Sequence, residues 1–517
     1  MISSLRHPTT YFLLAACLLV SHALFYSYLM GFDVVDDAYI SFRYAYNAAR
    51  GYGLTFNVGE RRVEGYTNFL WTVLFIPCFW LNLPPHLTAV VLGLVWALGC
   101  LVLLWRAGRS TLGDRWLSAI AVLLLAADGS FALWAAGGME STLFALLVLG
   151  GALAYLREMQ APNTLPLSGA WFALAALTRP EGVLVFALTG VHQVVTRLVT
   201  APSGKGLRLA TRQDWERLGF FLLIWVPWFA FRWRYYGFPL PNTFYAKVTL
   251  TGSGAQRARG WAYVETWIRV HMGYLPLVVA LLPLLRSRWR LWSSYSLLIL
   301  VAYAAYIGYV GGDWSVGRFF VPLAPFYYLL LAGGLIVADE YIRGTWLKSQ
   351  VRQRVKVPSW VAVGIVTIVV AGLCAGLFVA SSWNGEKALF LDPFDARLAG
   401  RARTEMGKWL YAHVPRDTYI AVDAAGQMPF YSDLKALDLF GLNDLTIGHR
   451  QVAEMGKGTP GHEKMDMNYV IFVAHPDYII IYGTAFDWLS AYSYQRVDLP
   501  WTADPQLKAF LGVYERQ

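Results

Sequence analysis

The sequence predicts a polytopic α-helical membrane protein followed by a small C-terminal α/β domain. Hydrophobic residues make up 57% of the 517 residues and charged residues only 15%, with a mean hydropathy of +0.43. Soluble domains carry about a quarter charged residues, so this composition is typical of an integral membrane protein. Apolar runs of spanning length continue to about residue 381, and ordinary charge density follows. We therefore predict a transmembrane domain over 1–381 and a second domain over 382–517.

About eleven apolar segments are candidates for membrane spans, which need roughly 17 to 25 residues each. They lie near 10–30, 86–105, 116–134, 140–157, 166–178, 181–198, 217–235, 272–286, 291–310, 318–337 and 359–381. The first lacks a small-residue cleavage site, so we interpret it as a retained anchor rather than a signal peptide. The short aromatic run 69–83 contains Pro77, and we interpret it as a juxtamembrane or half-inserted helix.

Lys and Arg residues cluster in loops between the apolar segments, which is the pattern of cytoplasmic loops. The clusters lie within 106–115, 197–217, 286–290 and 343–356. If 69–83 does not cross the bilayer, all four loops face the cytoplasm. Segment 31–68 then forms the first external loop, and an odd number of crossings places 382–517 outside as well. The net charge of +10 is explained by this orientation, and no nucleic-acid partner is predicted.

The C-terminal segment contains short strand-like runs, such as Tyr419–Val422 and Tyr478–Ile481, separated by helix-like runs. This alternation predicts a small α/β domain. The four cysteines lie apart inside apolar runs without a C-x-x-C motif, so packed thiols are predicted. No His, Asp or Glu cluster has clear metal-ligand spacing, and the sequence predicts neither a metal nor a cofactor.

The first external loop, 31–68, holds the strongest group of candidate site residues. Two adjacent carboxylates, Asp36 and Asp37, follow the first span directly. Ionisable side chains at a membrane boundary are costly unless they have a function or a partner. The alternative is a structural role, because Asp before the run AYISFRYAYNAAR is an ordinary helix N-cap. Further candidates in this loop are Arg43, Glu64, Tyr66 and Asn68.

Charged residues in the later external loops each allow two interpretations. Lys247 follows PNTFYA and either binds a phosphate or extends to the lipid headgroups. Arg318 binds an anion or pairs with Asp313, and Arg179 contacts substrate or forms a salt bridge with Glu181. Two more residues are ambiguous in the same way: Glu140 complements a helix dipole or binds sugar hydroxyls, and His462 binds substrate or is simply solvated.

The loop sequence resembles a known family. The string DDAYISFRYAYNAARGYGLTFN at 36–57, followed by VEGYTNFLW at 63–71, resembles the first external loop of bacterial GT-C arabinofuranosyltransferases. That family includes the terminal β-(1→2)-arabinofuranosyltransferases of mycobacterial cell-wall arabinan and the pilin arabinosyltransferases. Weaker matches extend over most of the chain: GGMES (137–141), LTRPEG (177–182), PNTFYAK (241–247), GGDW (311–314), GRFFVP (317–322), DLFGLND (438–444), IGHR (447–450) and GHEK (461–464).

The resemblance implies the GT-C glycosyltransferase fold and a multi-pass protein of the bacterial inner membrane with an extracytoplasmic active site. Its implied donor is a polyprenyl-phosphate sugar, with decaprenyl- or undecaprenyl-phosphate arabinofuranose preferred, and its implied acceptor is an external glycan such as arabinan. Asp37 becomes the preferred catalytic carboxylate, acting as general base on a hydroxyl, with Asp36 positioning the acceptor or sharing that role. The leaving phosphate would be met by Lys247, Arg318 and Arg179. The expected substrate-binding residues are Arg43, Glu64, Tyr66, Asn68, Glu140, Asp313 and His462.

Alternatives remain open at the level of the sequence. The acceptor could be a pilin or a lipopolysaccharide, and a lipid-linked sugar transporter or flippase could use the same basic and aromatic groove without chemistry. The stereochemical outcome is also open. A general base implies inversion, whereas the β-configured donor and β-linked product of the arabinan relatives imply retention, through an aspartate nucleophile or a front-face route.

Overall fold

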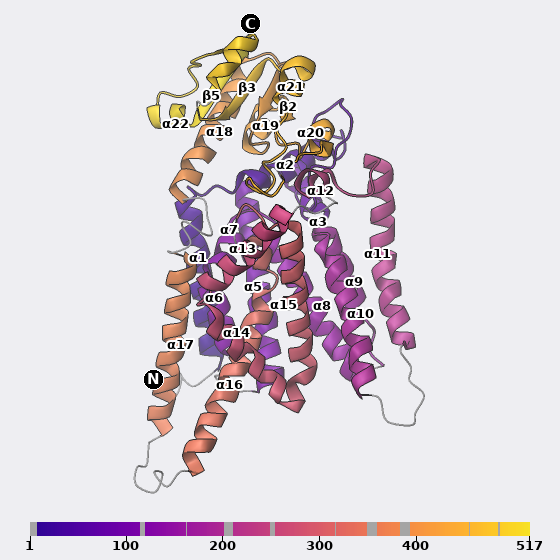
Figure 1. Ribbon diagram of the computed structural model, residues 1–517, viewed down its shortest axis with the longest axis vertical. Helices are drawn as coiled ribbons and strands as arrows, with labels where there is room; N and C mark the ends of the chain where they lie inside the picture. Colours follow the sequence, from indigo (N-terminus) through magenta and orange to yellow (C-terminus); the bar gives the residue numbers. More distant parts are fainter. Residues whose placement is uncertain are drawn as a thin grey trace.

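The computed structural model describes residues 8–113, 119–161, 163–200, 210–248, 254–315, 317–348, 359–382, 393–453, 455–483 and 486–517. Long helices form an elongated bundle, and a small sheet domain that contains the C-terminus sits on one end of it (Figure 1). The chain is therefore a polytopic helical membrane protein with a small C-terminal sheet domain, as the sequence predicts. The predicted boundary at 381/382 falls at the end of α17 (Ser359–Ser382), next to residues 383–392, which lie outside the described ranges.

Within the described ranges, five helices are long and apolar enough to cross a membrane, or six if one strongly bent pair counts as a single span. The five are α1 (Pro8–Leu29), α5 (Pro85–Leu112), α8 (Ser141–Gln160), α10 (Glu181–Thr200) and α15 (Arg290–Val310). The bent pair is α13 (Gly254–Val270) with α14 (Tyr274–Leu281), which meet at 84°. The other predicted spans correspond to the short helices α6 (Ile120–Ala127), α7 (Gly129–Ala136) and α9 (Ser168–Thr178) and to the long helices α11 (Arg212–Tyr236), α16 (Ala324–Lys348) and α17.

Two of the predicted spans differ from the observed helices for identifiable reasons. The segment 116–134 is divided at Asp128, whose side chain accepts the backbone N–H groups of Ser130 and Phe131 and so starts α7 as a separate helix. The segment 318–337 begins later than expected, because a 3₁₀ turn at Arg318–Phe320 precedes α16. Pro325 then occupies the first turn of α16, where a proline costs no hydrogen bond.

Segment 31–68 contains the helix α2 (Asp36–Ala49), which lies between the bundle and the sheet domain. Helix α2 packs against α3 (Phe69–Leu74) and α4 (Ile76–Trp80) on one side and against α19 (Gln427–Ser432) of the C-terminal domain on the other. Because α3 and α4 together run only from 69 to 80, this apolar segment is too short for a full span. Helix α12 (Asn242–Lys247) lies beside segment 31–68.

The C-terminal domain is built on a five-stranded mixed sheet with the order β2-β1-β3-β5-β4. Strands β1 (Tyr419–Val422), β2 (Lys435–Asp438) and β3 (Tyr478–Tyr482) are parallel, and β5 (Leu511–Arg516) runs antiparallel to β3 and to β4 (Tyr494–Arg496). Ile420 pairs in register with Ala436 and Tyr478. The domain also contains α18 (Pro393–His413), α20 (Leu445–His449), α21 (Met467–Tyr469) and α22 (Pro505–Phe510).

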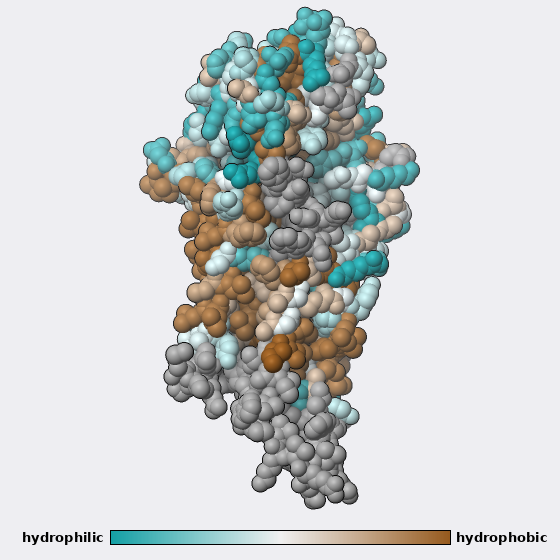
Figure 2. All heavy atoms as spheres, turned by 90° about the vertical axis from the view of Figure 1, so that its left-hand side faces the viewer, coloured by the Kyte–Doolittle hydropathy of each residue, from teal (hydrophilic) through white to brown (hydrophobic). Residues whose placement is uncertain are grey.

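The molecular surface changes character along the long axis. Figure 2 shows hydrophobic side chains over the helical body and hydrophilic side chains over the sheet domain. This division is expected when the bundle lies in lipid and the sheet domain lies in water. The junction between the two parts therefore falls at the membrane boundary, and it contains segment 31–68.

Candidate active site

Asp36 and Asp37 occupy the first turn of α2 but face different surroundings. The N-cap of this helix is Val35, and no side chain caps it, so the predicted capping role falls to neither aspartate. The Asp36 carboxylate accepts the backbone N–H groups of Gly426 and Gln427, each at 2.9 Å. Burial raises the pKa of Asp36 despite these bonds and the nearby Arg403 guanidinium. Asp36 thus joins the membrane domain to the C-terminal domain.

Asp37 faces two cavities instead. Its side chain is 27% exposed, and its Oδ2 atom accepts the indole N–H of Trp314 at 3.3 Å. The Nη1 atom of Arg318 lies 3.7 Å from the same oxygen. A first cavity of about 310 Å³ lies toward the bundle and a second of about 750 Å³ lies toward the C-terminal domain, and Asp37 and Lys247 line both. This arrangement leaves the Asp37 carboxylate accessible where the two cavities meet.

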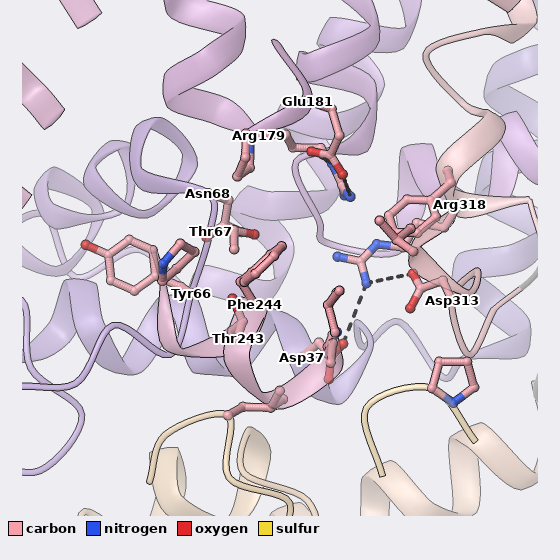
Figure 3. Close-up of a pocket in the computed structure, with 18 of the residues that line it drawn as sticks. Asp37, Tyr66, Thr67, Asn68, Arg179, Glu181, Thr243, Phe244, Asp313 and Arg318 are labelled. Atoms are coloured by element: carbon pink, nitrogen blue, oxygen red, sulfur yellow. Dashed lines mark hydrogen bonds and ion pairs between the residues drawn. The ribbon is translucent and has the colours of Figure 1, made fainter. Parts of the chain in front are cut away.

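Arg318 is the central cation of the first cavity. Its guanidinium lies 3.4 Å from Oδ2 of Asp313 and 3.4 Å from Oε1 of Glu140 in addition to its contact with Asp37. Figure 3 shows Arg318 between Asp37 and Asp313, with the guanidinium directed toward the centre of the site. The side chain is only 8% exposed, and its Nε atom has no hydrogen-bond partner within the described ranges. A buried guanidinium with an unsatisfied donor is suited to bind an anion.

Glu140 organises the opposite wall of the first cavity. Its carboxylate is 1% exposed, and it accepts Nδ2 of Asn68 and Nη1 of Arg179, each at 2.8 Å. Arg179 also donates to Glu181, at 3.0 Å, and stacks its guanidinium near the ring of Phe319. Arg179 therefore forms the predicted salt bridge with Glu181 and also lines the cavity in which a substrate would bind. The two carboxylates beside Arg179 lie at 2.8 and 3.0 Å, closer than the three beside Arg318, which lie at 3.4 to 3.7 Å.

Lys247 ends α12 and lies between the two cavities. Its side chain packs along Gly461, which has a positive φ and approaches so closely that a Cβ there would lie 3.1 Å from the lysine Cε. Within the described ranges, the Lys247 ammonium forms no ion pair or hydrogen bond. Its position is fixed from the other end of the helix, where Asn242 donates to the carbonyl oxygens of Gly441 and Leu442.

Two predicted substrate-binding residues have structural roles. Arg43 is buried and donates to the carbonyl oxygens of Phe56 and Leu434, each at 2.7 Å, so it joins the first loop to the C-terminal domain. Glu64 is buried in an ion pair with Arg232 of α11, whose Nε lies 3.0 Å from Oε1. Neither side chain lines the two cavities. In the structure, partners remote in sequence satisfy both groups, which leaves neither of them a contact with the cavities.

The remaining predicted residues divide between the two cavities. Tyr66 and Asn68 line the first, and the Tyr66 hydroxyl contacts that of Tyr236 at 3.1 Å. His462 is exposed and lines the second cavity, where its ring contacts Phe440 edge to face. The site also contains residues that the sequence did not single out. The most informative are Trp314, which holds Asp37, and three arginines of α18 in the second cavity, Arg397, Arg401 and Arg403.

Comparison with known proteins is informative for the fold. The model aligns with the crystal structure of ArnT from Cupriavidus metallidurans bound to undecaprenyl phosphate at 16% identity and a TM-score of 0.60, covering 96% of this chain and 97% of that chain. The apo form of ArnT aligns at 17% identity and a TM-score of 0.58 over the same shares of the two chains. The arabinofuranosyltransferase AftD from Mycobacteria aligns at 14% identity and a TM-score of 0.43, covering 96% of this chain and 40% of that chain.

These likenesses identify the architecture. The chain has the GT-C fold, which confirms the fold class predicted from the sequence. Identity below a fifth does not transfer an activity, and the TM-score with AftD is too low to support an argument. Residues 395–511 match a family described as a domain of unknown function (DUF8728), a range that covers most of α18 and strands β1 to β4. No curated protein matches the chain.

Proposed function

We propose that this protein is a membrane glycosyltransferase that transfers a sugar from a polyprenyl-phosphate donor to a hydroxyl of an external acceptor. One observation carries the proposal: the accessible carboxylate of Asp37 lies where two cavities meet, beside Arg318 and Lys247. The GT-C fold gives this site its context, and the ArnT structure with undecaprenyl phosphate supports a lipid phosphate as the ligand class.

The first cavity is suited to the donor. Its volume of about 310 Å³ is at the lower end of the range for small-molecule sites, so it fits a sugar phosphate whose lipid chain extends into the bilayer. Arg318, with its unsatisfied Nε, and the unpaired Lys247 meet the phosphate. As the bond between the sugar and the phosphate breaks, negative charge grows on the phosphate oxygens, and these two cations stabilise it.

Asp37 acts on the acceptor in this scheme. A hydroxyl is a weak nucleophile, so the carboxylate accepts its proton as the oxygen attacks the anomeric carbon. Trp314 donates to Oδ2 of Asp37 and so holds the carboxylate in one orientation. Asp36 does not line the first cavity, and each of its carboxylate oxygens accepts a backbone N–H group of the C-terminal domain, so its role is to hold that domain in place. We therefore assign general-base catalysis to Asp37 alone.

The proposal also covers the sugar that is transferred, the acceptor and the location of the protein. Arabinofuranose is the proposed sugar, because the sequence of the first external loop resembles that of arabinofuranosyltransferases, and the proposed acceptor is a cell-wall glycan. The proposed location is the bacterial inner membrane, with the active site and the C-terminal domain on the external side. Loop charges support this orientation, since the basic clusters alternate with the loops that carry the site.

The substitution Asp37→Asn tests the proposal because it keeps the size of the side chain and removes the base. Transfer from a short-chain polyprenyl-phosphate arabinose to a synthetic acceptor should fall by about a hundredfold or more. Asp433→Asn is the matched control, since Asp433 forms an exposed ion pair with Arg50 outside both cavities. Unchanged turnover in Asp37→Asn, in a protein that elutes and melts like the wild type, would remove Asp37 from the reaction.

A further inference from the structure

The second cavity differs from the first in its position, its size and the residues that line it. It lies between the start of α2, the helix α18 and the loops that follow β1 and β2, so both domains form its walls. Its volume of about 750 Å³ exceeds that of the first cavity, and the two share Asp37 and Lys247. A molecule in the second cavity therefore reaches the catalytic carboxylate from the side opposite the bundle.

Three of the five carboxylates that line it accept hydrogen bonds from neutral donors, whereas Oδ1 of Asp423 has no partner within the described ranges. Asp33 accepts the Tyr39 hydroxyl at 2.6 Å and Nε2 of Gln427 at 3.0 Å. Asp36 accepts two backbone N–H groups. Asp438 is buried and accepts the backbone N–H groups of Phe440 and Asn443. None of these three forms a salt bridge with the arginines that line the same cavity within the described ranges.

Two of the three guanidinium groups that α18 places in this cavity, those of Arg397 and Arg403, form no ion pair within the described ranges. Neither of them has a hydrogen bond within the described part of the chain. Arg401, between them, pairs with Glu405 on its own helix at 3.3 Å. The unpaired Lys247 adds a further positive charge at the inner end. Arginine side chains that form no ion pair keep their hydrogen-bond donors available to an anionic ligand.

We propose that the second cavity binds the acceptor, and that Arg397 and Arg403 recognise a negatively charged group on it, a phosphate or a carboxylate carried by the acceptor glycan. The inference rests on the proposed transfer reaction, because it assigns to this cavity the molecule whose hydroxyl Asp37 deprotonates. Guanidinium groups suit this role, since their planar forks match the oxygen pairs of both anions. The charged group sits against α18 and the reacting hydroxyl points toward Asp37.

Binding measurements on the full-length protein in neutral detergent test this proposal without requiring turnover. The probes are one trisaccharide in three forms, neutral, carboxylated and phosphorylated, with affinity measured by calorimetry. The charged forms should bind the wild type at least about tenfold more tightly than the neutral form. The double variant Arg397→Gln/Arg403→Gln should lose that preference, and Arg403→Lys should keep part of it. The form bound more tightly identifies the anion.

Lys408→Gln is the control variant, because Lys408 lies on the same helix outside the cavity, and it should leave the preference intact. In the transfer assay, the double variant should raise the acceptor KM for charged acceptors and leave the donor KM unchanged. Equal binding of neutral and charged probes by the wild type, or a preference that survives in the double variant, would overturn the inference. A charge preference in a protein without transferase activity would instead overturn the proposed function and leave the anion site standing.

Discussion

At the scale of single residues, Asp36 and Asp37 show how neighbours in sequence acquire different roles. Consecutive side chains on an α-helix project about 100° apart, so two adjacent acids in the first turn of α2 cannot face the same partner. Asp36 turns to the backbone of Gly426 and Gln427, whereas Asp37 turns to Trp314 and the cavities. Helix geometry therefore explains why the two carboxylates have different contacts.

A substitution of Lys247 tests whether its side chain binds the donor phosphate. If its ammonium holds the donor phosphate as a point charge, Lys247→Ala should weaken donor capture and leaving-group stabilisation together. Loss of a charge-assisted contact in a partly buried site costs about 1.5–3 kcal/mol, which corresponds to roughly a ten- to hundredfold loss of kcat/KM. Lys247→Arg should recover part of the activity, because the guanidinium keeps the charge with a different reach.

The measurement for Lys247 varies donor and acceptor concentrations independently. Lys508→Ala is a suitable control, since Lys508 forms an ion pair with Asp498 on the surface of the C-terminal domain. Unchanged donor KM and kcat in Lys247→Ala would show that this lysine only extends to the lipid headgroups. The phosphate contact would then rest with Arg318 alone.

At the scale of elements, α12 links the two parts of the site. It is too short to be stable by itself, and its position depends on contacts at both ends. The backbone N–H of Asn242 donates to the carbonyl oxygen of Glu64 at 3.0 Å, and its side chain donates to the loop after β2. Lys464 donates to the carbonyl oxygen of Tyr245 from the C-terminal domain. The ion pair of Glu64 with Arg232 therefore supports the position of Lys247, the proposed phosphate ligand, indirectly.

The loop after β2 gives a prediction for pH. Asp438 ends this strand, and burial raises its pKa to about 6, although Asn443 and Phe440 donate to it. The unfolded carboxyl titrates near 3.8, so between these values the folded state keeps a proton that the unfolded state has lost. The stability that Asp438 contributes is complete below pH 3.8, decreases as the pH rises and is lost above about pH 6. The total effect is about 3 kcal/mol.

Thermal unfolding of the wild type and of Asp438→Asn, measured from pH 4 to pH 7 in neutral detergent, isolates this contribution, because the asparagine does not titrate. The difference between the two melting temperatures should change across this interval, with the wild type losing stability relative to the variant as the pH rises. Parallel curves would show that Asp438 titrates normally.

At the scale of the whole molecule, the site lies at one end of the bundle and the basic loops lie toward the other. Figure 1 places the end of α10 and the start of α11 at the end of the bundle opposite the sheet domain. Reporter fusions after Thr200 and after Lys348 should therefore report the cytoplasm, and a fusion at the C-terminus should report the external side. A cytoplasmic C-terminus would place the active site on the wrong side for an external acceptor and would refute the proposed orientation.

The sequence by itself determined the class of fold and singled out the segment that carries the candidate site. Apolar runs of spanning length cannot be accommodated in water, so composition and spacing suffice to predict a helical membrane protein with a polar C-terminal domain. The segments that were predicted less well are those in which a local polar group interrupts the pattern, as Asp128 does between α6 and α7. The distinctive first loop pointed to Asp36 and Asp37 because carboxylates at a membrane boundary require an explanation.

Only the tertiary structure decided which of these residues share a site. Arg43 and Glu64 look like substrate ligands in the loop sequence, but distant groups, the carbonyl oxygen of Leu434 and the guanidinium of Arg232, satisfy them. Conversely, the arginines of α18 lie more than 350 residues after Asp37 and meet its cavity only because the C-terminal domain folds back over α2. A sequence records the chemistry of each side chain, whereas burial and partners depend on contacts between distant segments, and those contacts determine which charges remain free to bind a ligand.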